Sequence, residues 1–156
     1  AGNLFNEVFN TNYTSGHPGY DWAAGNNYYS QGVATSTHPT SITATNNITY
    51  YGSSIQLSMP YSLLLKQISA RSHAGNQNAN NVLEDVVLLG SNDNGQTFDL
   101  IVETTFPIEV WDEITTITPT ITNTTAYNMI RLVISKFHGT GGAAILEYFD
   151  LIGDVY

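Results

Sequence analysis

Short strand-like segments separated by turn residues fill the chain from Tyr50 onward, and they are the strongest constraint on its fold. Apolar and polar residues alternate in several of them, which is the period of a half-buried β-strand. Turn signals recur about every 8–12 residues, as in β-sandwiches and barrels. No stretch carries a long amphipathic helical pattern. The expected strands are residues 54–59, 63–71, 82–91, 97–104, 115–122, 127–136 and 144–152.

Turn chemistry divides these strands. A turn is expected at residues 60–62, and a hairpin turn at residues 92–95, where Asn, Asp and Gly tolerate positive φ. The start of a calcium-binding loop is the alternative interpretation of residues 92–95. Pro119 cannot donate to a ladder, so its strand should lie at an edge or bend there. The glycine-rich residues 137–143 are expected to form a loop rather than a dinucleotide site, because no βαβ pattern surrounds them.

Residues 1–49 show little sustained periodicity. Seven of the thirteen residues 35–47 are Ser or Thr, which predicts a loop or a weak edge strand. This segment is also a candidate arm that reaches a neighbouring molecule, with a disordered linker as the alternative. We therefore expect an N-terminal arm with the first strands at 1–49 and a sandwich at 50–156, together forming one domain.

Charge excludes two classes of partner. The 156-residue chain has a net charge of −9 and only four Lys and Arg residues. Four cations cannot neutralise the roughly 6–10 phosphates of a typical DNA interface, and they do not favour an anionic membrane surface. No apolar run is long enough for membrane insertion. The polar, mostly uncharged composition suits hydrogen bonding to sugars or packing into a protein assembly, and a neutral-polar surface without sugar preference is the alternative.

Enzyme chemistry has little support in the sequence. Neither a nucleophile elbow nor a zinc-protease motif is present. Adjacent acidic residues on a strand point to opposite faces, so they do not form a catalytic pair. A pair from distant residues, such as Asp21 with Asp112, is the remaining possibility. The chain is therefore expected not to be an enzyme.

The segment from Arg71 to residue 81 combines a cation, a histidine and four asparagines. The Arg fork and Asn amides can hydrogen-bond vicinal sugar hydroxyls. Arg71, His73, Asn76 and Asn78 are therefore candidate ligand-binding residues. The alternative is a polar loop in which Asn side chains satisfy their own backbone.

Aromatic and histidine side chains supply further candidates. Tyr20 and Trp22 could form a stacking platform, although burial in the core is the more common fate of Trp. His138 falls in an expected loop, where it either contacts ligand or is simply exposed.

Four segments resemble the discoidin family, also called coagulation factor V/VIII type C domains, which is similar to the family 32 carbohydrate-binding modules. They are SIQLSMPYS (54–62), LLGSNDNGQTF (88–98), TAYNMIRLV (125–133) and AAILE (143–147). Their order and spacing match the family over about two thirds of the chain. The resemblance implies an eight-stranded jelly-roll sandwich that binds ligands on loops at one end.

The resemblance also implies site residues. Arg71 matches the arginine of the sugar-binding relatives, with Asn76 or Asn78 a few residues on. Glu147 matches a position that often holds a structural calcium, and Asp21 is the nearest match to an N-terminal Asp-Gly signature. That signature is otherwise unclear in residues 1–49, and the disulfide of animal members is absent.

Two functions follow as expectations. The first is a non-catalytic, lectin-like carbohydrate-binding or adhesion module of a microbial or viral exterior protein. It would bind an extracellular or cell-surface glycan, at a cell surface or on a virion. The second is a structural virion or surface-assembly protein, such as a capsid decoration or tail fibre, that uses the same fold to pack as a homo-oligomer or with assembly partners.

Overall fold

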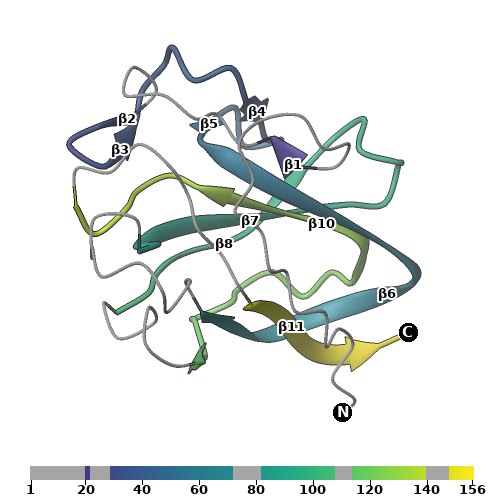
Figure 1. The fold of residues 1–156 in the computed structure, drawn as a ribbon. Coiled ribbons are helices and arrows are strands. Elements are labelled where there is room, and N and C mark those ends of the chain that lie inside the picture. The colour runs from purple at the N-terminus through teal and green to yellow at the C-terminus, as the bar shows by residue number, and fades with distance from the viewer. Residues whose placement is uncertain (1–19, 22–28, 72–81, 108–113, 140–147) are drawn as a thin grey trace.

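Every ladder in the described part of the chain is antiparallel, and no helix occurs there (Figure 1). This computed structural model describes residues 20–21, 29–71, 82–107, 114–139 and 148–156. The expected all-β sandwich is therefore confirmed, and the described residues alone form eleven strands where about eight were expected. They are β1 (Tyr20–Asp21), β2 (Tyr29–Ser30), β3 (Val33–Ala34), β4 (Ser41–Thr43), β5 (Thr49–Tyr51), β6 (Ser53–Arg71), β7 (Asp85–Ser91), β8 (Asp99–Thr105), β9 (Thr115–Ile117), β10 (Tyr127–Ile134) and β11 (Tyr148–Val155).

The 19-residue strand β6 belongs to both layers of the sandwich. Its first half pairs with β1 and β10 in the order β1-β6-β10-β7-β8, the layer that we call the larger sheet. Its second half pairs with β11 and β9 and forms the other layer, which we call the smaller sheet. Through β6 the two layers are joined into one seven-stranded sheet. Figure 1 shows β6 crossing beside β10, turning at one side of the molecule and returning alongside β11.

The turn expected at residues 60–62 is wrong, because the backbone stays extended through the bend. The ladder between β6 and β10 jumps from Ser58 to Leu63, so Pro60 lies in the gap where no partner in β10 needs its missing N–H.

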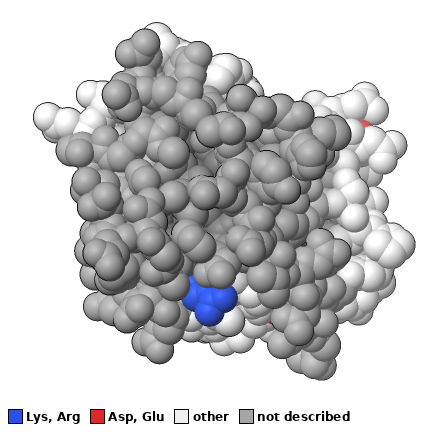
Figure 2. Space-filling view, viewed as in Figure 1, with Lys and Arg blue, Asp and Glu red and all other residues white. Residues whose placement is uncertain are grey.

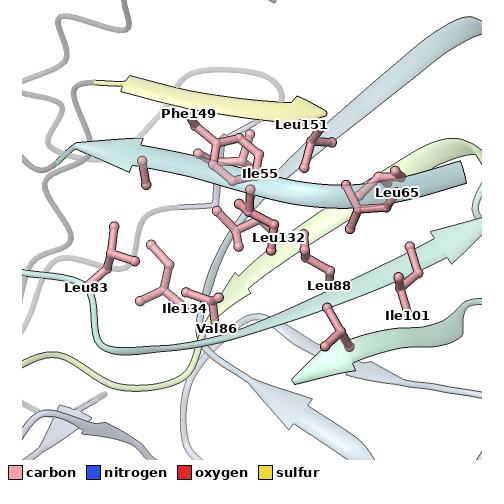
Figure 3. Packing of buried hydrophobic residues seen from close by; sticks show 14 of the residues in the cluster. Ile55, Leu65, Leu83, Val86, Leu88, Ile101, Leu132, Ile134, Phe149 and Leu151 are labelled. Atoms are coloured by element: carbon pink, nitrogen blue, oxygen red, sulfur yellow. The ribbon is translucent and has the colours of Figure 1, made fainter. Parts of the chain in front are cut away.

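One apolar cluster fills the space between the two layers. It includes Leu132 and Leu88 from the larger sheet and Ile68 and Leu151 from the smaller one, each 2% exposed or less. Figure 3 shows these layers facing each other, with side chains from β6, β7, β10 and β11 between them. Alternate residues of each strand point inward, which is the period that the sequence predicted.

A second apolar cluster covers the opposite face of the larger sheet. Leu89 and Val133 point away from the main core and pack under Ile42 and Tyr50 of the β4–β5 hairpin. Both faces of β7 are therefore buried, which explains its continuous apolar run. Residues 41–47, a part of the candidate arm, therefore lie in a hairpin that packs on the sheet of the same chain.

The 92–95 turn forms as expected. Asn94 and Gly95 have φ values of 59° and 78°. The Asp93 carboxylate accepts hydrogen bonds from the Ser91 hydroxyl, from the amides of Gln96 and Thr97, and from the Thr97 hydroxyl. These bonds hold the pKa of Asp93 at about 2, below its ordinary value of 3.8. The carboxylate is committed to the turn, which is the role expected of a β-turn residue rather than of a calcium ligand.

The strand expected over residues 115–122 is much shorter than its β-branched composition predicts. Only Thr115–Ile117 pairs, with β6, and the ladder ends two residues before Pro119. Proline removes a donor and restricts the residue before it, so tertiary pairing stops there despite high β-propensity.

Candidate functional site

Arg71 is the last residue of β6 and lies at one end of the sandwich. It pairs with Tyr148, the first residue of β11. Figure 1 places the end of β10 on the same side of the molecule as the start of β11. The bend in β6 causes this arrangement, because it brings the second half of the strand back toward the end where the first half began. Arg71 is half-buried, and the Nε of its guanidinium is shielded from solvent, so the side chain is held close to the end of the strand.

Polar side chains line the outer face of the smaller sheet next to Arg71. Ile68 and Ala70 point into the core, so Ser69 and Arg71 lie on the opposite face of the strand, where Ser69 is only 3% exposed. Ser69 lies between Asp150 of β11 and Thr116 of β9 in the register, and its hydroxyl is 2.6 Å from the Thr116 hydroxyl. These residues form what we call the Arg71 row: Arg71, Ser69, Thr116, Tyr148 and Asp150.

Asp150 carries a buried carboxyl in this row, with the residue only 1% exposed. The Tyr148 hydroxyl donates to its Oδ2 at 3.3 Å. Burial, followed by the Asp150 charge and this bond, raises the pKa of the Tyr148 phenol. Tyr148 therefore stays neutral and donates inward, which leaves its ring as a half-buried aromatic surface beside Arg71.

The Arg71 row offers the functional groups that polar ligands require. A guanidinium supplies rigid paired donors, and an aromatic ring supplies a surface for an apolar ligand face. Groups of this kind can hold a polyhydroxyl compound through hydrogen bonds and packing alone.

The structure gives His138 intramolecular contacts. Its Nε2 lies 2.8 Å from the Phe106 carbonyl oxygen, so Nε2 carries the proton, because a carbonyl can only accept. Its Nδ1 lies 3.6 Å from Glu84, whose carboxylate also receives the Lys136 ammonium at 2.6 Å. His138 joins the segments after β10, before β7 and after β8 at the Arg71 end.

Several predicted site residues lie outside the described residues: His73, Asn76, Asn78, Trp22 and Glu147. Tyr20 and Asp21 are described only through the backbone of β1, where they pair with Ile55 and Ser54. Among the candidates, the structure describes the side chains of Arg71 and His138, and both lie at one end of the sandwich.

Sequence reasoning missed Tyr148, Ser69 and Asp150. An alternation signal was present, because Phe149 and Leu151 occupy the inward positions of β11 and leave residues 148 and 150 on the other face. The pattern identifies that face but cannot show that Asp150 is buried on it.

The charged groups of the described residues are sparse. Figure 2 shows one face of the molecule, on which their basic atoms form a single small patch and few acidic atoms are visible. Within these residues, no three His, Cys, Asp or Glu side chains gather as a metal-binding group. No helix in the same residues is long and apolar enough to cross a membrane.

No family model and no curated protein matches the chain. Among solved structures, the chain is similar to the C-terminal domain of a chitobiase from Bacteroides fragilis, with 22% identity and a TM-score of 0.51. That match covers 67% of this chain and 64% of the other, just under two thirds of its length.

A second similar structure is CpGH89CBM32-5 from Clostridium perfringens, in complex with GalNAc-β-1,3-galactose. Its identity is 21% and its TM-score 0.51, over 69% of this chain and 70% of that one. At such identities the similarity establishes the fold. The protein shares the antiparallel β-sandwich fold of these structures, which is the architecture expected from the resemblance.

Proposed function

We propose that the protein is a non-catalytic carbohydrate-binding module whose site is the Arg71 end of the sandwich. The observation that carries this proposal is the position of Arg71, half-buried at the end of β6 and paired with Tyr148. A fixed cation beside an aromatic ring suits a neutral sugar, whose hydroxyls accept from the guanidinium while its C–H face packs on the ring. The fold shared with a module crystallised with GalNAc-β-1,3-galactose supports the same ligand class.

Exterior placement belongs to this proposal. A glycan-binding module acts where glycans are displayed, on an extracellular, cell or virion surface. A structural role in a virion or surface assembly is the second candidate function. The low share of charged residues, 11% of the chain, favours it. The β4–β5 hairpin packs on the sheet of its own chain, so it does not support an arm that reaches a neighbouring molecule.

Calcium remains part of the proposal as a structural ion held by Glu147 and Asp21. The described residues gather no metal-binding group of their own. A bound calcium would order loops at the site rather than take part in chemistry.

The test is a glycan array, followed by calorimetry on any sugar bound by the whole chain. Arg71→Lys keeps the charge but loses the fork geometry, and Arg71→Ala loses both. We expect affinity to fall by about tenfold or more in Arg71→Ala, which is the loss of one charge-assisted hydrogen bond. Lys66→Ala is the matched control, because Lys66 is an exposed cation paired with Asp154 elsewhere on the smaller sheet.

Binding that survives Arg71→Ala would move the site away from this end. A folded protein that binds no glycan, with or without calcium, would favour the assembly role. Glycan binding that persists in the presence of a chelator would show that the site does not need calcium.

A further inference from the structure

A groove of about 330 Å³ opens on the larger sheet, on the outer face that also carries the β4–β5 hairpin. Its walls are the paired strands β7 and β8 together with Ser135, which follows β10. Val87 lies in its floor and is also part of the second apolar cluster. The groove is therefore built on rigid, paired strands, and it belongs to a different sheet from the Arg71 row.

Two carboxylates face this groove from neighbouring strands. Asp85 lies opposite Thr105, and Glu103 lies opposite Val87, so both occupy the same face as diagonal neighbours. The Thr105 hydroxyl donates to Asp85 Oδ1 at 2.7 Å. The Tyr50 hydroxyl donates to Glu103 Oε1 at 2.8 Å. Each carboxylate is thus held in place through one oxygen.

The hydrogen bonds already made inside the groove determine which groups remain for a ligand. Thr105 and Tyr50 use their hydroxyl protons on the two carboxylates, and Ser135 uses its own on the Asp85 carbonyl at 3.1 Å. The second oxygens, Asp85 Oδ2 and Glu103 Oε2, have no partner among the described residues. The groove consequently presents acceptors and almost no donors.

The charge of the two groove carboxylates is also compensated only in part. Lys136 is the cation next to this region, but its ammonium is bound to Glu84 at 2.6 Å. The hydrogen bond to Glu84 raises the pKa of Lys136 most, and the charges of Glu84 and Asp85 raise it further. Lys136 therefore binds Glu84 and attracts Asp85 more weakly, which leaves the groove with a net negative charge.

We infer that this groove is a second ligand site, specific for a small polyhydroxylated ammonium compound such as an amino sugar with a free amine. The ammonium supplies donors and charge to Asp85 and Glu103, and ring hydroxyls donate to the remaining lone pairs. A metal ion fits less well, because two carboxylates fall short of the six to eight oxygens that calcium takes. The volume lies within the range of small-molecule clefts.

The experiment titrates the whole chain with glucosamine, with glucose and N-acetylglucosamine as neutral comparisons, and follows backbone amides by NMR. We expect glucosamine alone to shift the amides of β7 and β8. Asp85→Asn and Glu103→Gln are the variants, since each keeps the oxygen that accepts from Thr105 or Tyr50 and removes only the charge. Each should weaken glucosamine binding by about tenfold or more, the cost of a charge-assisted bond.

Asp154→Asn is the control, because it removes one carboxylate from the other sheet. Equal weakening by this variant would show non-specific attraction to an acidic protein and would overturn the inference. So would shifts of the same size with the neutral sugars, or no shift in β7 and β8. Arg71→Ala separates this site from the proposed glycan site, because it should leave the glucosamine shifts unchanged.

Discussion

The ring of Tyr127 lies directly over Gly90, and a methyl group at Gly90 would collide with it. The two residues are on adjacent strands, β10 and β7. The Tyr127 hydroxyl donates to Asp99 Oδ2 at 3.0 Å and accepts from Asn123 at 2.8 Å, so the ring cannot swing aside without breaking both bonds.

Gly90→Ala should therefore destabilise the protein by about 1–3 kcal/mol, the cost of overpacking a filled core. Chemical denaturation with matched m-values measures this change. Tyr127→Phe in the Gly90→Ala background serves as the companion variant. It releases the ring from Asp99 and should reduce the additional cost of the alanine. An unchanged denaturation midpoint in Gly90→Ala would show that the ring does move.

Gly95→Val should cost about 1 kcal/mol or more, because Gly95 adopts a φ of 78° that β-branched side chains rarely reach. Thermal unfolding is the measurement. Gln96→Val, at the next and exposed position of the same turn, controls for the valine itself. Equal melting temperatures for Gly95→Val and the unmodified chain would contradict the turn geometry.

Asp93 predicts a pH dependence of stability with a defined sign. Its folded pKa of about 2 lies below the ordinary 3.8, so the ionised carboxylate stabilises the folded state above the unfolded pKa. This contribution is fully present above about pH 5, declines as the pH falls, and is lost below about pH 2.

Asp93→Asn should melt at a lower temperature than the unmodified chain at pH 7. The difference between the two melting temperatures should narrow as the pH falls from about 5 to about 2, the range set by the unfolded and folded pKa values of Asp93. Melting curves of both proteins across this range make the comparison. Asp154→Asn, with an exposed carboxylate in a surface ion pair, is the control. A gap that stays constant with pH would exclude the charge of Asp93 as its cause.

Ile42→Ala tests whether the β4–β5 hairpin stabilises its own chain. Ile42 is 8% exposed above Leu89 and Val133 in the second cluster. Its loss should cost about 2 kcal/mol or more, as for a buried large-to-small change. The cost should not depend on protein concentration, since the contact is intramolecular. A loss of stability that appears only at high protein concentration would instead indicate that the hairpin packs on a neighbouring molecule.

The sequence predicts most of the larger sheet because its strands carry their own signal. Residues 127–134 and 85–91 are rich in aliphatic residues, and the intervening turn residues at 92–95 fix the hairpin between β7 and β8. The bend in β6 has no comparable local signal. Pro60 looks like a turn residue, and only the exchange of pairing partners from β10 to β11 keeps the strand extended there.

The site is predicted less completely than the fold. The alternation of residues 63–71 predicts that Arg71 ends a strand, and the structure has it there. The resemblance to sugar-binding relatives makes Arg71 a candidate for the site. The burial of Asp150 and the groove between Asp85 and Glu103 depend on which strands become neighbours. Glu103 pairs with Val87, 16 residues away, and Asp150 pairs with Ser69, 81 residues away; such pairing is a tertiary property that periodicity does not encode.

Strand β6 also determines when the molecule can fold during synthesis. Apart from β1, its ladder partners β9, β10 and β11 all follow it in the chain, β10 by more than fifty residues. In a nascent chain that has been synthesised only as far as β8, β6 lacks its partners β9, β10 and β11, so neither layer is complete. The apolar faces of β6 and β7 are then exposed to other chains. Folding therefore waits for β10 and β11 to leave the ribosome, and chaperone binding to β6 should protect the chain until then.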